Sequence, residues 1–382
     1  MLKKKIFKVL LISVVVILCF STVASATNAI TNTKTTRIAK VPTKIYDGER
    51  FSCVGGATTD NDKHSMFVLK SSDTENHATL YYYPDLTDAT SRSTYYTYRV
   101  PGAGHANGMT IDSNSIYITC WSNIAGENTG DNKIIAISLD TIDTLPQTKL
   151  GYVLQEHHYN VINAKSKTIS SNGSISYSNY GSEIRTITKY TGDGIFLIRS
   201  NINAGNDFAY TVARLETYNG STILSVSSDP ADTFIVKNTL SATVYHGQDI
   251  CYSPYTGLLI PVWYGHKVNG VPTDYCKNEI MWVNIVDGSY STKTIDNVSY
   301  KYYTPTNIVV DHTNTIGYGV QKYTKFEIES IAITKNKRML LACNIEFTTE
   351  FETEYEERND GVAVGGDGVY RLTYDTGGNI LL

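Results

Sequence analysis

The sequence predicts an all-β fold built from a repeated unit, and two observations support this. Short runs of Ile, Val, Tyr, Thr and Phe alternate with clusters of Gly, Asn, Asp and Ser, a pattern typical of strands joined by turns. A histidine-led segment also occurs twice, beginning at His105 and at His246. Each copy leads through a turn into an apolar strand that ends in tryptophan, at Trp121 and at Trp263. Such self-similarity indicates that one supersecondary unit was copied and stacked.

Aligning the two histidines extends the repeat along the chain. Strand-turn-strand units are expected at residues 51–70, 105–121, 183–199, 246–263 and 329–344. Each is followed by a third strand, and the units begin about 55 to 80 residues apart, which is long for a propeller blade but leaves room for loops. A β-sandwich would show no such recurrence, so the sequence predicts a β-propeller. We expect five blades; six is the alternative, if residues 303–323 form a shortened blade.

A resemblance supports this fold. The segments His-Ala-Asn-Gly-Met, at residues 105–109, and His-Gly-Gln-Asp-Ile, at residues 246–250, resemble the histidine-led strands that open the blades of secreted propeller proteins of Gram-positive bacteria. The resemblance implies a secreted bacterial β-propeller and no particular activity. Residues 36–46 precede the first unit, and we expect this N-terminal strand to close the ring by pairing with the last blade, because closure removes exposed strand edges.

The first 26 residues have the three parts of a secretory signal peptide. Lysines up to Lys8 lead into an apolar run at residues 9–20, and Ala24-Ser25-Ala26 supplies the small residues before a cleavage point. An uncleaved anchor is the alternative, but a spanning helix needs about 20 apolar residues. We therefore expect a signal peptide at residues 1–26 and a single secreted, extracellular propeller domain at residues 27–382, with no transmembrane segment in the mature chain.

Charge argues against nucleic acid as the partner. The chain carries 33 Lys and Arg against 37 Asp and Glu, for a formal net charge of -4, and the signal segment contains lysines but no acid. The mature chain is therefore more acidic still, whereas nucleic-acid binding needs basic stripes.

The cysteines of the mature chain are Cys53, Cys120, Cys251, Cys276 and Cys343. None is spaced as a CxxC pair, and we expect mostly reduced core residues, with one disulfide as the alternative.

In a propeller the first strand of each blade lines the central channel, so the residues that open those strands converge on one mouth. The candidate ligand-binding residues selected in this way are His105, Asn107, His246, Gln248, Glu183 and Glu329. Imidazole, amide and carboxyl groups around one axis can bind a ligand, hold a metal or move protons. The pattern assigns no catalytic residue, metal or cofactor. The alternative to a ligand site is a purely structural role, in which these side chains only hydrogen-bond neighbouring blades.

The 29 tyrosines modestly favour a glycan ligand, since tyrosine offers a flat face and a hydroxyl to a sugar ring, although strands favour tyrosine as well. We therefore expect a secreted propeller that binds an extracellular glycan or other envelope polymer at the channel mouth. One alternative is a glycan-active hydrolase or lyase that uses the channel histidines and glutamates. The other is a pure protein-interaction scaffold. The acidic stretch at residues 350–360 is a weaker candidate for binding calcium.

Overall fold

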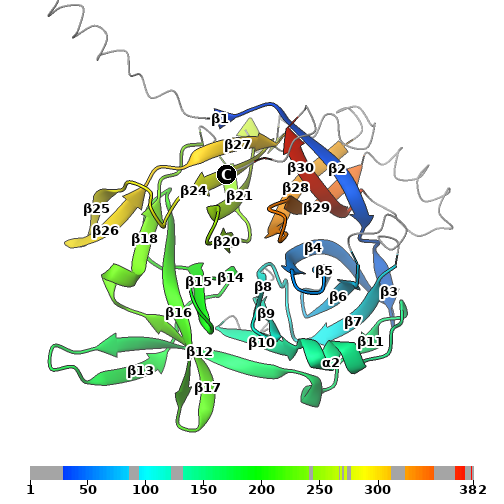
Figure 1. The fold of residues 1–382 in the computed structure, drawn as a ribbon, viewed down its shortest axis with the longest axis horizontal. Coiled ribbons are helices and arrows are strands. Elements are labelled where there is room, and N and C mark those ends of the chain that lie inside the picture. The colour runs from blue at the N-terminus through cyan, green and yellow to red at the C-terminus, as the bar shows by residue number, and fades with distance from the viewer. Residues whose placement is uncertain are drawn as a thin grey trace, which may run out of the picture.

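The computed structural model describes residues 29–85, 94–121, 132–240, 244–265, 267–268, 271–272, 277–310, 323–347, 366–374 and 380. Within these ranges the chain is almost entirely strand, which confirms the predicted all-β fold (Figure 1). Its helical segments are short: α2 (Leu139–Thr144) and the 3-10 turns η2 (Glu156–His158) and η3 (Pro230–Asp232). The signal segment and the acidic stretch lie outside the described residues. No helix among the described residues is long and apolar enough to span a membrane.

The strands form four large curved sheets and one small hairpin. The first sheet contains, in spatial order, β11 (Tyr152–Val153), β7 (Tyr96–Pro101), β6 (His77–Tyr83), β5 (Ser65–Ser72), β4 (Glu49–Asp60) and β3 (Lys44–Tyr46). The fourth contains β2 (Thr33–Lys40), β30 (Gly368–Tyr374), β29 (Met339–Phe347) and β28 (Tyr323–Ile333). The hairpin pairs β22 (Lys267–Val268) with β23 (Val271–Pro272).

The two remaining sheets lie between these in chain order. The largest runs through β25 (Ser291–Ile295), β26 (Val298–Tyr303), β18 (Thr233–Val236), β16 (Phe208–Tyr218), β17 (Ser221–Ser227), β12 (Asn160–Ile169), β10 (Lys133–Ser138), β9 (Ser115–Cys120) and β8 (Met109–Asp112), with β13 (Ile175–Asn179), β14 (Ile187–Lys189) and β15 (Ile195–Arg199) as branches. The other contains β1 (Ala29–Ile30), β27 (Thr306–Val310), β24 (Lys277–Val283), β21 (Gly257–Gly265) and β19 (Val244–Gly247), and β20 (Cys251–Ser253) pairs with β21.

Five strands, one from each sequence-predicted unit, form a ring. β4 contacts β8, β8 contacts β14, β14 contacts β20, β20 contacts β28, and β28 contacts β4 again. We call these the inner strands, and Figure 1 shows them around the centre of the molecule. Each leads into a second and a third antiparallel strand, as the repeat predicted. β27, within residues 303–323, pairs with β24 as a further strand of the fourth unit.

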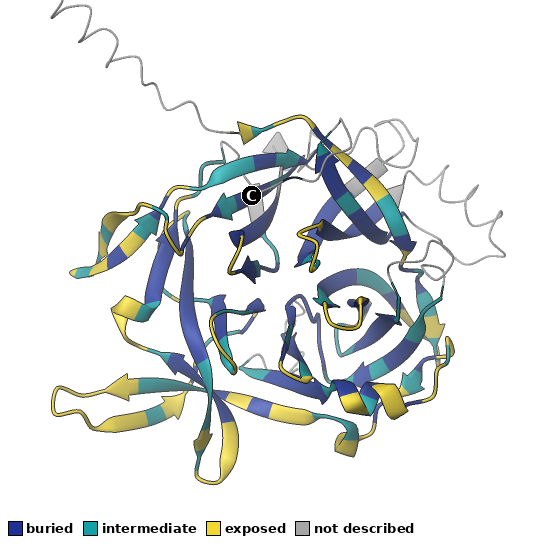
Figure 2. Cartoon of the chain, in the orientation of Figure 1, coloured by how far each residue is buried: buried dark blue, intermediate teal, exposed yellow. Residues whose placement is uncertain are grey.

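The hydrophobic core lies between neighbouring units rather than at one centre. One cluster packs Leu69 and Leu80 of the first unit against Ile118 of the second, and comparable clusters join the other neighbours around the ring. Figure 2 shows the same distribution, with exposed residues concentrated in turns and in the projecting β12–β13 hairpin. Each unit therefore buries both faces of its sheet only by stacking on its neighbours.

Asp249 joins the inner strands to one another. This residue precedes β20 and is fully buried. Its carboxyl accepts hydrogen bonds from the Ser330 hydroxyl at 2.8 Å and from the Met109 backbone N–H at 3.4 Å, on β28 and β8. Ser330 in turn accepts from the Ala57 N–H of β4 at 2.9 Å. The carboxyl of Asp249 thus connects β20 directly to β8 and β28, and to β4 through Ser330.

Glycine permits the close approach that this network requires. A Cβ on Gly56 of β4 would lie 2.8 Å from the Cβ of Met109 on β8 and 2.9 Å from its backbone nitrogen. A Cβ on Gly108 would lie 2.9 Å from the backbone nitrogen of Ile187. Both contacts are too short for any larger residue, so the spacing of β4, β8 and β14 depends on these two glycines.

The N-terminal segment pairs with the last unit. β2 runs antiparallel to β30, from Thr33 opposite Tyr374 to Lys40 opposite Gly368. The expected strand at residues 36–46 is instead divided, because β3 pairs with β4 of the first unit. A buried ion pair between Lys70 and Asp367, 2.6 Å long, joins the first unit to the last.

Four of the cysteines are free thiols in the structure, Cys53, Cys120, Cys251 and Cys343, and Cys276 lies outside the described residues.

Replacing Asp249 with alanine should lower the free energy of unfolding by about 3 kcal/mol, because it leaves buried N–H groups on neighbouring strands and the Ser330 hydroxyl without their acceptor. Urea denaturation measures the change. Asp287→Ala, at an exposed position, is the control and should change stability by less than about 0.5 kcal/mol. Equal effects of the two substitutions would contradict the role of Asp249 in the ring.

Asp249→Asn keeps the acceptor oxygen and tests the protonation state. Burial raises the pKa of Asp249 well above its ordinary value of 3.8, although hydrogen bonds from the backbone and Ser330 oppose the shift. The folded protein therefore retains a proton that the unfolded chain releases above about pH 4. This contribution to stability is complete at lower pH and declines as pH rises through the folded pKa. The asparagine variant should lack that decline, and an unchanged pH slope would contradict the raised pKa.

Gly56→Ala should lower the free energy of unfolding by about 2 kcal/mol, since the added methyl group forces β4 away from Met109. Thermal or urea denaturation measures the loss. Gly181→Ala is the matched control, because a Cβ at Gly181 meets no atom within 4 Å. If both variants are as stable as the parent protein, the close packing of β4 on β8 is not required.

Candidate functional site

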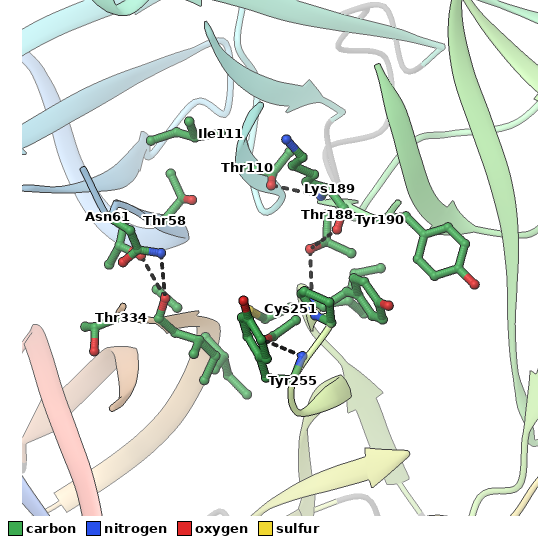
Figure 3. A pocket seen from close by; sticks show the side chains of 18 of the residues that line it. Thr58, Asn61, Thr110, Ile111, Thr188, Lys189, Tyr190, Cys251, Tyr255 and Thr334 are labelled. Carbon is green, nitrogen blue, oxygen red and sulfur yellow. Dashed lines mark hydrogen bonds between the residues drawn. The ribbon is translucent and has the colours of Figure 1, made fainter. Parts of the chain in front are cut away.

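A cavity of about 830 Å³ opens at the carboxyl ends of the inner strands. All five inner strands contribute to its wall, together with the turns that follow most of them. Seven serine and threonine side chains line it: Thr58, Thr59, Thr110, Thr188, Thr191, Ser253 and Thr334. Figure 3 shows several of them around the opening, with Asn61 beside Thr58 and Thr334. A concave, preformed space with many hydroxyl groups suits a polar, uncharged or weakly charged ligand.

Some of these hydroxyls also hold the wall together. Thr110 accepts a hydrogen bond from the backbone N–H of Lys189 at 2.9 Å, so it bridges β8 to β14. Thr188 accepts from the N–H of Tyr252 at 2.9 Å, which bridges β14 to β20. The neighbouring inner strands β8, β14 and β20 do not pair with one another in a backbone ladder, and these side chains accept backbone N–H groups instead. A hydroxyl that accepts such a bond can still donate its own proton to a ligand.

Tyr255 is the most exposed aromatic residue at the cavity. It lies in the turn after β20, and 75% of its surface is accessible. The Ser253 hydroxyl accepts the Tyr255 backbone N–H and holds this turn. Figure 3 places Tyr255 at the rim, across the opening from Ile111. Tyr190 is less accessible and packs edge-on against Tyr252, with ring centroids 4.8 Å apart. Tyr255 is therefore the residue best placed to stack on a ligand.

The ionisable groups of the cavity are unsuited to acid-base catalysis at neutral pH. Among the described residues that line it, the only charged side chains are lysines, and none is Asp, Glu or His. Burial raises the pKa of the Cys251 thiol to about 12, and burial also raises the pKa of Tyr190 and Tyr252. Hydrolysis of a glycosidic bond by the usual route needs two carboxyl groups. The cavity wall, as far as the structure describes it, provides neither.

The residues selected from the sequence lie at the opposite ends of the inner strands. They precede the strand segments that line the cavity, and none of them is part of its wall as described. Asn107 and Gln248 do meet, as their equal offset suggested: the Asn107 amide donates to Gln248 Oε1 at 3.4 Å. Gln248 then donates to Glu327 Oε1 at 2.5 Å. These three side chains form a row of hydrogen bonds at the amino end of the ring.

His105 is separate from that row. It is mostly buried, its Nδ1 lies 3.0 Å from a carboxyl oxygen of Glu75, and its ring packs on Trp121 with centroids 5.0 Å apart. The Arg185 guanidinium covers Trp121 at 4.7 Å and also pairs with Glu183. Glu183 is thus separated from His105 by Arg185 and Trp121. Trp121 therefore packs between His105 of the second unit and Arg185, which precedes β14 of the third.

Two candidates are placed differently from the sequence alignment. The backbone of His246 lies in β19 opposite Trp263, and the side chains of both are outside the described residues. Glu329 is buried, its backbone carbonyl accepts from Asp249 N–H at 3.1 Å, and its carboxyl lies near Cys343, whose pKa it helps to raise after the larger effect of burial. Glu327, two residues earlier, is the one that meets Gln248. Glu329 lies at a bulge of β28, where the register with β29 shifts between Ile328 and Ser330.

The cavity residues were not predicted from the sequence, because the histidine-led repeat marks only the starts of the inner strands. The turns that follow them contain Tyr255 and the lysines. The segment Ser253-Pro254-Tyr255-Thr256-Gly257 is an evident turn by its composition. An aromatic residue exposed in a turn between two buried strands was the available signal, since a structural role alone would not require it there.

Comparisons with known proteins assign no activity. No protein-family model and no curated protein matches the chain. Among solved structures, hydrazine synthase of Kuenenia stuttgartiensis is 11% identical, with a TM-score of 0.37 over 85% of this chain and 87% of that one. A luciferin-regenerating enzyme is 10% identical, with a TM-score of 0.37 over 89% and 95%. A GH43 glycoside hydrolase is 12% identical, with a TM-score of 0.33 over 79% of this chain and about half (52%) of that one.

Proposed function

We propose that this protein is a secreted, five-bladed β-propeller that binds an extracellular glycan, or another envelope polymer, in the cavity at the carboxyl ends of its inner strands. The ring of five inner strands supports the blade number, and the pairing of β2 with β30 supports closure by the N-terminal segment. The signal-peptide pattern of residues 1–26 supports secretion. The blades would stack around one axis, with the cavity at one mouth of the channel.

The observation that carries the proposal is the composition of the cavity wall. It combines hydroxyl groups from several blades with an exposed tyrosine, and the described part contains no carboxyl or imidazole group. Hydroxyls and Asn61 can exchange hydrogen bonds with sugar hydroxyls, and Tyr255 can stack on the apolar face of a pyranose ring. Binding needs only such a platform and a few polar groups, whereas catalysis also needs an acid and a base at one atom.

A glycan-active hydrolase or lyase is the second candidate, with its site at the amino end of the ring. The contact of His105 with Glu75 supports it, because a carboxylate at Nδ1 fixes the orientation of an imidazole that acts as a base. Asn107, Gln248, Glu183, Glu329 and the unplaced His246 side chain would complete that site. Release of reducing ends or unsaturated products from a polysaccharide, abolished by His105→Ala, would favour this candidate over binding.

Tyr255→Ala should weaken binding of the glycan by about five- to tenfold, which is the loss expected when one aromatic stacking contact is removed. Calorimetric titration with soluble polysaccharides measures the affinity. Tyr290→Ala is the matched control, because Tyr290 is also an exposed tyrosine, 54% accessible, beneath a lysine ammonium but away from the cavity. Unchanged binding by Tyr255→Ala, with loss in a Gln248→Ala variant, would place the ligand at the amino end instead.

Binding in the cavity should not change between about pH 5.5 and 8. The described wall contains no Asp, Glu or His, and burial raises the pKa of Cys251 to about 12. A site built on imidazoles would respond in this range. Repeating the titration with Asp249→Asn excludes an indirect effect of that buried carboxyl. Binding in the cavity would be contradicted if affinity fell markedly at the lower pH values, if Asp249→Asn showed the same fall, and if His105→Ala did not.

A further inference from the structure

The cavity differs in charge from the protein that surrounds it. The chain as a whole has more acidic than basic residues, 37 against 33. The described wall of the cavity, by contrast, contains three lysines, Lys189, Lys335 and Lys337, and no carboxylate. Charged groups of one sign in a concave site focus their field and attract ligands of the opposite sign. The strength of this field depends on how far nearby carboxylates neutralise each ammonium.

Two of the lysines are neutralised to different degrees. The Lys189 ammonium lies 2.5 Å from Asp112 and 3.2 Å from Asp193, neither of which lines the cavity. Burial lowers the pKa of Lys189, but the hydrogen bonds that its ammonium donates to these two carboxylates outweigh burial and raise it. Lys189 therefore carries a compensated charge. Among the described residues, the carboxylate paired with Lys335 is Asp62 at 4.0 Å, and it is almost fully exposed, so water screens the pair.

Lys337 has no carboxylate partner among the described residues, and its ammonium lies over the ring of Tyr255, 5.2 Å from the centroid. Its backbone is in the left-handed region, with φ of 57°. The turn keeps it there, because the Lys337 N–H donates to the Thr334 carbonyl and the Arg338 N–H donates to the Thr334 side chain. The turn therefore fixes the direction of the Cα–Cβ bond of Lys337. The uncompensated charge thus stands beside the proposed stacking platform.

We propose that the ligand is an acidic glycan, whose sugar ring stacks on Tyr255 while its carboxylate or sulfate group pairs with Lys337, with Lys335 as a weaker second cation. This inference rests on the proposed glycan binding and adds the class of the ligand. Tyr255 and Lys337 come from the turns after two neighbouring inner strands, β20 and β28. A single charged sugar residue bridging those turns would contact both at once. A neutral polymer would leave the ammonium of Lys337 without a counter-charge.

The test compares each acidic polymer with its own neutral form. Polygalacturonate and its methyl ester differ only in carboxylate charge, and κ-carrageenan and its desulfated form differ in sulfate. We expect at least one acidic polymer to bind about fivefold or more tightly than its neutral form, which is the strength of one screened ion pair. The preference should diminish as sodium chloride is raised from about 0.05 to 0.5 M. The pair that shows it identifies carboxylate or sulfate as the recognised group.

The Lys337→Gly variant tests the role of the Lys337 ammonium without destabilising the fold. Glycine suits the left-handed backbone at this position, so the variant should be at least as stable as the parent protein. It should lose the preference for the acidic polymer while retaining its Tyr255-dependent binding. Lys301→Gln is the matched control, since Lys301 covers the exposed Tyr290 ring at 5.3 Å away from the cavity. It should leave the preference unchanged.

The outcomes separate the two levels of the proposal. Equal affinity for the acidic and neutral forms, or a preference that persists in Lys337→Gly, overturns the acidic-glycan inference and leaves glycan binding intact. Absence of any Tyr255-dependent binding to all four polymers overturns the proposed function and the inference together. Loss of the acidic preference in Lys301→Gln as well as in Lys337→Gly would assign the effect to overall charge, and that also overturns the inference.

Discussion

The fold depends on how one buried carboxyl group holds the inner strands. Gly56 and Gly108 let three of these strands approach so closely that no side chain fits between them, and Asp249 then offers a common acceptor to groups from its neighbours. Burying such a group is costly unless its hydrogen bonds are made. The ring is therefore stable only when the surrounding strands are in register with Asp249. The outer strands and the clusters between units build outward from this centre.

Asp249 also divides the ring into two ends with different chemistry. Toward the amino ends of the inner strands, Asn107, Gln248 and Glu327 are joined by hydrogen bonds. Toward the carboxyl ends, hydroxyl groups such as Thr188 accept backbone N–H groups of the neighbouring inner strand. The cavity lies at this end and is lined by residues of all five inner strands. Close packing through glycine on one side of Asp249 is thus followed by a polar concavity on the other.

The charges of that concavity are distributed unevenly. Acids such as Asp112 lie behind the described wall and pair with Lys189, while Lys337 lies over Tyr255 and has no carboxylate partner among the described residues. In the proposed function, this ammonium and the aromatic face beside it select the ligand. The His105–Glu75 contact at the other end is the place where proton transfer would be chemically reasonable, which is why mutants at the two ends distinguish binding from catalysis.

The sequence by itself determined the all-β class, the repeated three-strand units and the equal offset of Asn107 and Gln248, because alternation, turn residues and internal similarity are local properties of the chain. Tertiary structure decided the rest. Glu327 rather than Glu329 meets Gln248, and β2 starts earlier than the pattern suggested. Nothing near Asp249 in the sequence distinguishes it as the centre of the ring, since its partners Met109 and Ser330 are 140 and 81 residues away. The position of the cavity was likewise undetermined, because it depends on where strands from distant parts of the chain converge and where they diverge.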